Sequence, residues 1–140
     1  MKAKQFLVVS MLALAPVVSA KAGETPAPAG SSVYLIEPKD GSTVKNPVKI
    51  VFGLKGMGVA PALVEWPNTG HHHLLIDVDN FDPNKPLPNN ATHLHFGGGE
   101  TEKIINLPPG KHTIQAVLGD HNHVPHATPV QSEKITITVE

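Results

Sequence analysis

Prolines and glycines divide this chain into short segments. The 140 residues include 14 prolines and 12 glycines. Beyond residue 32, no segment longer than about ten residues carries apolar side chains at helical spacing without a proline or glycine inside it. Proline removes a backbone donor and glycine costs conformational entropy, so neither suits a helix interior. The pattern favours short strands separated by turns.

Six short runs have the composition and the alternation of β-strands. In residues 48–54, for example, apolar side chains occupy every second position. Turn signals separate the runs, and no Cys…Trp…Cys pattern of antibody domains occurs. We therefore expect an all-β fold, a small antiparallel, immunoglobulin-like β-sandwich of about seven strands. The runs are 33–36, 48–54, 72–78, 101–107, 112–118 and 134–139.

Two connections between these runs have a distinct character. Residues 108–110 (PPG) separate two strand-like runs and indicate a hairpin-like connection. Residues 79–90 (DNFDPNKPLPNN) contain three prolines and four asparagines, a composition that predicts a surface loop.

The first 22 residues have the pattern of a signal peptide. Lys2 and Lys4 precede a 13-residue apolar stretch, 6–18, and the small-x-small cleavage pattern Ala20-Lys21-Ala22 follows, with 18–20 as the near alternative. A retained membrane anchor is the other interpretation, but 13 residues are short for a span of about 20. We expect cleavage, a flexible lead-in over 23–32, a His-rich β-sandwich domain over 33–140 and a periplasmic or secreted protein without a membrane contact. The mature part would hold 8 lysines against 12 acidic residues, a net charge of −4.

Missing residue types exclude several functions. The chain has no cysteine, which rules out disulfides, thiolate metal sites and cysteine nucleophiles. All 11 basic residues are lysines, so the arginine that commonly reads guanine is absent. With a formal net charge of −1 and no basic stripe, nucleic-acid binding is not expected.

Histidines concentrate in one part of the chain. All nine lie between His71 and His126, and they include three His-x-His pairs. Residues i and i+2 of a strand point to the same side, roughly 6.5–7 Å apart, so two such imidazoles can bind one ion. Several pairs can therefore combine into one metal site. The candidate ligands are His71, His73, His95, His121, His123 and His126, followed by His93 and His72.

The available donors limit the choice of metal. Without thiolates, and with Met57 the only methionine of the mature part, nitrogen and oxygen donors remain. These donors favour divalent transition metals, foremost Cu(II) or Zn(II), over Cu(I) and blue-copper chemistry. Asp77, Asp120 and Glu100 are candidates for further ligands or for acceptors that orient an imidazole N–H.

Each histidine also has a structural interpretation. A single histidine is often a solvated or hydrogen-bonded residue. Exposed His-rich loops can also bind metals adventitiously, with no biological role for the metal. His72 shares a predicted strand face with Leu74 and Ile76, so it is either a buried structural residue or the most enclosed ligand. His112 begins the apolar face of the 112–118 run and is expected to be structural.

Other motifs fail on inspection. Residues 97–99 (GGG) lack the Gly-Lys-Ser/Thr of a phosphate loop and indicate a bulge or tight turn. The acidic run from Asp77 to Asp82 lacks the glutamate that closes an EF-hand, because position 88 is proline, and only an irregular calcium site stays open there. No G-x-S-x-G and no His-Glu-x-x-His motif occurs.

Several longer strings resemble one known family. They are GHHHLLID (70–77), HFGGGETE (95–102), LPPGKHTIQ (107–115), LGDHNHVPH (118–126) and ITITV (135–139). Together they are similar to the DUF4399 family of bacterial exported proteins over about residues 50–140. The resemblance implies that the strings belong to one domain. It implies no activity and no ligand set.

The sequence is compatible with three functions. The first is an exported protein that holds Cu(II) or Zn(II) through clustered histidines, for metal capture, delivery or resistance. The second is a metalloenzyme in which three histidines leave an open position on the ion, although nothing identifies a substrate. The third is a structural or interaction module of the cell envelope with no specific metal. Catalysis is the less expected outcome, and the protein partner is unknown.

Overall fold

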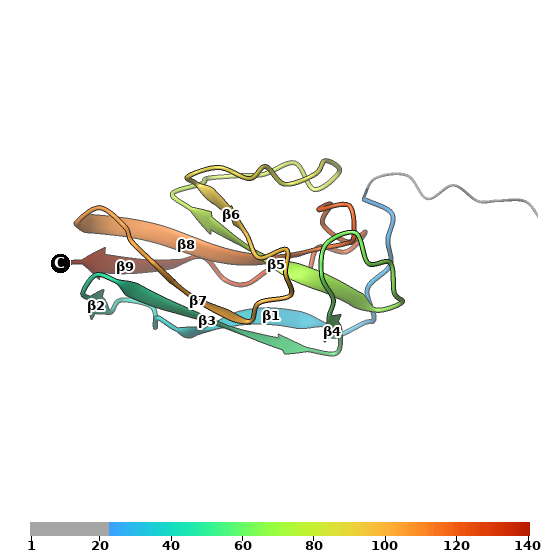
Figure 1. The fold of residues 1–140 in the computed structure, drawn as a ribbon, viewed down its shortest axis with the longest axis horizontal. Helices are drawn as coiled ribbons and strands as arrows, with labels where there is room; N and C mark the ends of the chain where they lie inside the picture. The colour runs from blue at the N-terminus through green and yellow to red at the C-terminus, as the bar shows by residue number, and fades with distance from the viewer. Residues whose placement is uncertain (1–22) are drawn as a thin grey trace, which may run out of the picture.

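The computed structural model describes residues 23–140, whose strands form two β-sheets (Figure 1). This confirms the predicted all-β sandwich with mostly antiparallel strands. Each of the six predicted runs overlaps a strand, and three further strands of two or three residues raise the total above the expected seven. The strands are β1 (Ser32–Glu37), β2 (Thr43–Val44), β3 (Val48–Lys55), β4 (Gly58–Val59), β5 (Thr69–Ile76), β6 (His93–His95), β7 (Glu102–Ile105), β8 (Gly110–Gly119) and β9 (Ile135–Val139).

The sheets differ in size. The smaller one has the order β1-β3-β7, and the larger one has the order β2-β9-β8-β5-β4, with β6 also paired to β5. The long neighbours β5, β8 and β9 pair antiparallel, whereas the short strands β2 and β4 pair in parallel with β9 and β5. No helix of residues 23–140 is long and apolar enough to cross a membrane.

The connection at 108–110 is not a hairpin, so that prediction was wrong. β7 pairs with β3 in the smaller sheet, while β8 pairs with β5 and β9 in the larger one. The prolines therefore lead the chain from one sheet to the other (Figure 1). Leu107, just before the turn, is buried in the core between the sheets.

The main core lies between the sheets and follows from side-chain alternation. On β5 and β8, every second residue faces the smaller sheet, including Leu74, Ile114 and Leu118, each 0% exposed. They pack with residues of β3 such as Ile50 and Phe52. Removing one such side chain from water on folding contributes about 1.5–3 kcal/mol to the stability of the folded state.

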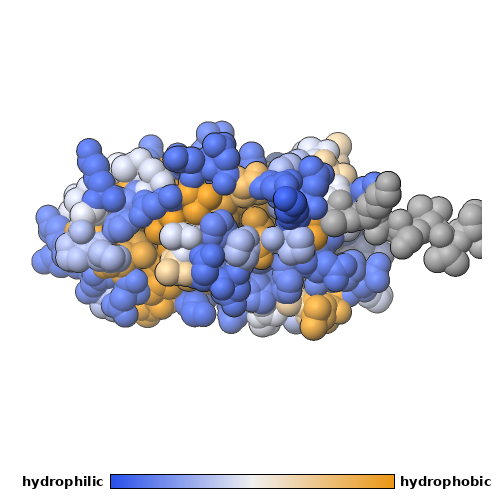
Figure 2. Space-filling view, turned by 90° about the horizontal axis from the view of Figure 1, so that it is seen from above, coloured by the Kyte–Doolittle hydropathy of each residue, from blue (hydrophilic) through white to orange (hydrophobic). Residues whose placement is uncertain are grey.

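The other face of the larger sheet has its own smaller core. Leu75 of β5 and Val117 of β8 pack there against Leu87, which comes from the predicted loop 79–90. That loop has no regular secondary structure, and most of its residues are exposed, as predicted. The view from above shows a mainly hydrophilic surface with smaller hydrophobic areas between (Figure 2). Through Leu87, loop 79–90 covers part of the outer face of the larger sheet.

The division of the chain into a signal peptide, a flexible lead-in and a β-sandwich domain stays a prediction. The proposed signal peptide, residues 1–22, lies outside the described residues. Within the predicted lead-in, Thr25 lies against the loop after β8. Its carbonyl accepts a hydrogen bond from the amide of Ala127, and its hydroxyl donates to Asp120.

His112 has a structural role. It lies near the start of β8, whereas the histidines of β5 pair with residues at the other end of β8. Its Nδ1 lies 2.7 Å from Oδ2 of Asp77 and its Nε2 lies 2.7 Å from the carbonyl oxygen of Pro108. Both partners are acceptors, so both ring nitrogens donate when the ring is protonated. The bond to Asp77, and next the bond to Pro108, raise the pKa of His112.

This arrangement predicts a pH-dependent contribution to stability. Because the folded-state pKa of His112 is raised, its contribution is complete below the unfolded value of 6.5 and disappears as the pH rises through the folded value. His112→Ala should lower the free energy of unfolding by about 1.5–3 kcal/mol in mildly acidic solution and by less at alkaline pH. Urea denaturation of both proteins at two pH values measures this. Lys111→Ala, an exposed neighbour on β8, is the control, and a loss independent of pH would contradict the interpretation.

Candidate metal centre

Four imidazoles from three segments meet on the outer face of the larger sheet. One ring nitrogen from each lies within 4.8 Å of the corresponding nitrogens of the other three. His71 and His73 belong to β5, His95 to β6 and His123 to the loop after β8. We call these four residues the four-histidine cluster. Its members are either buried or half-buried.

Alternation on β5 separates the cluster from the core. His71 and His73 point to the same side of β5, as the i and i+2 pattern predicted, and this side faces away from the smaller sheet. His72 points the other way. Its ring stacks on Phe52 of β3 with a centroid distance of 4.4 Å and an interplanar angle of 5°. His72 is therefore a core residue, whose pKa burial lowers to about 4.

β6 brings the third imidazole. The register pairs His95 with His73, which places the two side chains as cross-strand neighbours with ring centroids 5.2 Å apart. Two glycines leave space for the rings. A Cβ on Gly97 would lie 2.1 Å from Cε1 of His95, and a Cβ on Gly119 would lie 2.8 Å from Nε2 of His73. Larger residues at these positions would displace the imidazoles.

A tight loop after β8 positions the fourth imidazole, that of His123. The amide of His123 donates to the carbonyl of Asp120 at 2.9 Å, and the backbone of His123 has a φ of 67°. The Asp120 carboxylate accepts the amides of Asn122 at 2.8 Å and Val124 at 3.0 Å. These bonds hold His123 in the left-handed conformation, which costs free energy in a non-glycine residue.

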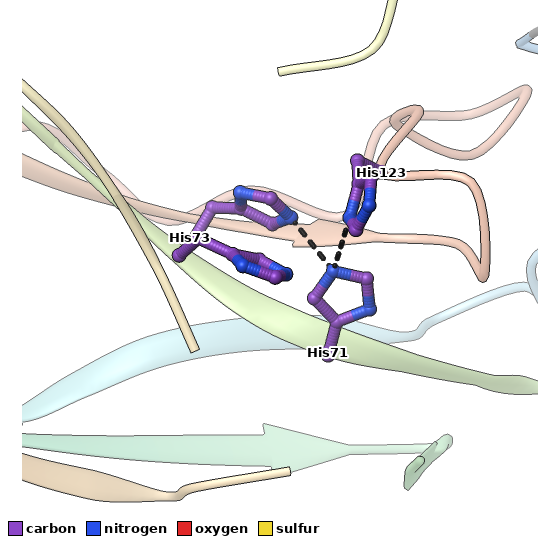
Figure 3. Close-up of side chains that lie close together, drawn as sticks. His71, His73 and His123 are labelled. Atoms are coloured by element: carbon purple, nitrogen blue, oxygen red, sulfur yellow. Dashed lines mark hydrogen bonds between the residues drawn. The ribbon is translucent and has the colours of Figure 1, made fainter. Parts of the chain in front are cut away.

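The central nitrogen of the cluster is Nε2 of His71. It lies 3.0 Å from Nε2 of His73 and 3.0 Å from Nδ1 of His123 (Figure 3). An imidazole nitrogen has either one proton or one lone pair, so it makes one regular hydrogen bond. Hydrogen bonding among the rings thus leaves one of the two contacts unsatisfied. A cation among the nitrogens would attract every lone pair at once.

The spacing suits a transition-metal ion. With metal–nitrogen bonds of 2.0–2.1 Å, two ligand atoms on one ion lie at most about 4.2 Å apart. A tetrahedral shell needs about 3.4 Å between ligand atoms, so a pair at the cluster's limit of 4.8 Å would have to approach by about 1.4 Å when an ion binds. Nε2 of His95 is buried and has no hydrogen-bond partner among residues 23–140.

The environment of His71, His73 and His95 lowers the pKa of each ring and so favours its uncharged form at neutral pH. Burial, and next the neighbouring rings, lower the pKa of His71 to about 4 and that of His73 to about 2. Burial and then His123 lower the pKa of His95. The Asp120 charge acts on His71 in the opposite direction, but burial dominates. Neutral imidazoles are the form that binds metals.

The other predicted ligands lie outside the cluster. His93 contacts the side chains of Asn90 and Thr92. Nε2 of His121 lies 2.8 Å from the side-chain Nδ2 of Asn122. His126 is buried, with Nε2 3.3 Å from the carbonyl oxygen of Thr69. Their role in metal binding, like that of His72, stays a prediction.

The three candidate carboxylates have other partners. Asp77 bonds to His112, Glu100 accepts the amide of Gly98, and Asp120 organises the His123 loop. Gly97 and Gly119 were missed as functional positions. For Gly97 the sequence signal was its position two residues after His95, whereas the place of Gly119 opposite His71 depends on the strand register.

The whole cluster falls inside a known family region. A family model described as a domain of unknown function (DUF4399) matches residues 50–140. The chain belongs to the DUF4399 family. The match confirms the resemblance noted from the sequence and covers β3 to β9. Searches of curated proteins and of solved structures found no match.

The space beside His95 allows a selective test of the cluster. Gly97 has no left-handed backbone, so Gly97→Ala creates a steric conflict with the imidazole without backbone strain. We expect this variant to bind zinc at least about tenfold more weakly, because one ligand is displaced.

Gly98→Ala is the matched control, since its Cβ would meet only the end of the exposed Glu100 side chain. Isothermal titration compares the two variants with the unaltered protein. Equal affinities in all three would show that the position of the His95 ring does not matter.

Proposed function

We propose that this DUF4399 protein binds one divalent transition-metal ion, Cu(II) or Zn(II), through His71, His73, His95 and His123. The convergence of four imidazoles on one another is the observation that carries the proposal. Nε2 of His71 lies close to ring nitrogens of both His73 and His123 but can form a regular hydrogen bond with only one of them. Burial keeps the rings of His71 and His73 neutral, the form that binds metals.

The donor set favours these two ions. Imidazole nitrogen suits copper and zinc, whereas magnesium and calcium prefer oxygen. The cluster contains neither a carboxylate nor a sulfur atom. Copper(II) binds nitrogen donors more tightly than zinc(II), so metal supply as well as affinity decides which ion is bound in the cell.

The number of ligands favours binding over catalysis. Catalytic zinc sites usually have three protein ligands and keep one position for water. Four histidines fill a tetrahedral shell, so the metal would have no free position for a substrate. Together with the predicted signal peptide, this supports metal capture, delivery or resistance in the periplasm or outside the cell.

Metal titration of tag-free protein tests the proposal. The unaltered protein should bind one zinc or copper(II) ion with submicromolar affinity. At a free metal concentration of 100 times the dissociation constant, its free energy of unfolding should rise by about 2.7 kcal/mol. His71→Ala and His73→Ala should each weaken binding by about 10–100-fold or more.

Three further variants define the extent of the site. His93→Ala, His121→Ala and His126→Ala remove predicted ligands that lie outside the cluster. The cluster alone accounts for binding if these variants keep the affinity of the unaltered protein. An affinity that is unchanged after loss of both His71 and His73 would refute the proposed site.

A further inference from the structure

The acidic side chain nearest in sequence to the cluster's loop histidine has an unusual environment. Asp120 follows β8 directly and is 4% exposed. It is the one buried carboxylate among residues 23–140. All other acidic residues in this part of the chain are exposed.

Hydrogen bonds satisfy this carboxylate without neutralising it. Oδ1 accepts the amides of Asn122 and Val124, and Oδ2 accepts the hydroxyl of Thr25 at 2.6 Å. Every partner is a neutral donor. No lysine in the described part forms an ion pair with Asp120. A buried charge without an opposite charge is unfavourable, so a compensating cation would be stabilised here.

Asp120 adjoins the cluster through its backbone. Gly119, the preceding residue, is the β-sheet partner of His71, and the Asp120 carbonyl accepts the amide of His123. The Asp120 charge also opposes the lowering of the His71 pKa. The other acidic groups near cluster loops are solvent-exposed, with Glu65 82% exposed and 4.0 Å from His121. Glu100 is exposed as well.

We propose that Asp120 is the counter-charge of the metal centre and makes it selective for divalent over monovalent ions. This inference rests on the proposed function. Four neutral imidazoles leave the full charge of the ion uncompensated. Coulomb attraction to one carboxylate is proportional to the charge of the ion, so Asp120 stabilises a dication twice as much as a monocation at the same position.

Asp120→Asn separates this charge from the loop geometry. The amide oxygen of asparagine can still accept the two backbone amides, and its NH2 group can donate to the Thr25 hydroxyl. Zinc and copper(II) affinities should each fall at least about tenfold. The metal-free variant should be at least as stable as the unaltered protein, because it no longer buries an unpaired charge.

Thr25→Val is the matched control. It removes the hydrogen bond to Oδ2 but keeps the charge, so its zinc affinity should change little. The reduction potential of the copper-loaded protein gives a second reading. It should rise in Asp120→Asn, because the lost charge stabilises Cu(II) more than Cu(I), and stay constant in Thr25→Val.

The outcomes separate the two proposals. Zinc binding that depends on His71 but is unchanged in Asp120→Asn overturns the counter-charge and leaves the metal site intact. A parallel loss of affinity and metal-free stability in Asp120→Asn, or an equal loss of affinity in Thr25→Val, shows a structural role and also overturns it. Absence of His71-dependent binding in the unaltered protein overturns the proposed function itself.

Discussion

The alternation of side chains along β5 determines where the candidate site lies. This strand is hydrogen-bonded to β8 on one side and to β4 and β6 on the other, and its residues from Gly70 to Ile76 are all buried. Consecutive histidines therefore enter two environments. His72 stacks on Phe52 between the sheets, while His71 and His73 face outward. A shift of one residue in register would exchange these roles. Imidazoles on a central strand are held rigidly, which favours a preorganised site.

Much of the fold was predictable because its signals are local. Apolar alternation and flanking prolines or glycines marked six runs, and each overlaps a strand. The strands β2, β4 and β6 have too few residues for a periodic signal, and pairing with distant segments creates them. The crossing at 108–110 was mistaken for a hairpin because a turn motif does not reveal which sheet the next strand joins.

The site was predictable only where it depends on strand periodicity. The pair His71 and His73 followed from that rule. His95 joins the cluster because of its register opposite His73, which one sequence does not contain. His123 joins, and His121 does not, because the segment is a tight loop in which His123 has a left-handed backbone. The i and i+2 rule does not apply to such a loop.

The central claim is that these four imidazoles share one cation. X-ray absorption at the metal edge of the zinc- or copper(II)-loaded protein tests it most directly, since this measurement counts the ligands and identifies imidazole by its outer-shell scattering. Four nitrogen neighbours at about 2.0 Å, with the scattering of four imidazoles, are the predicted result. A shell dominated by oxygen, or a spectrum unchanged when His71 and His73 are both replaced by alanine, would contradict the account.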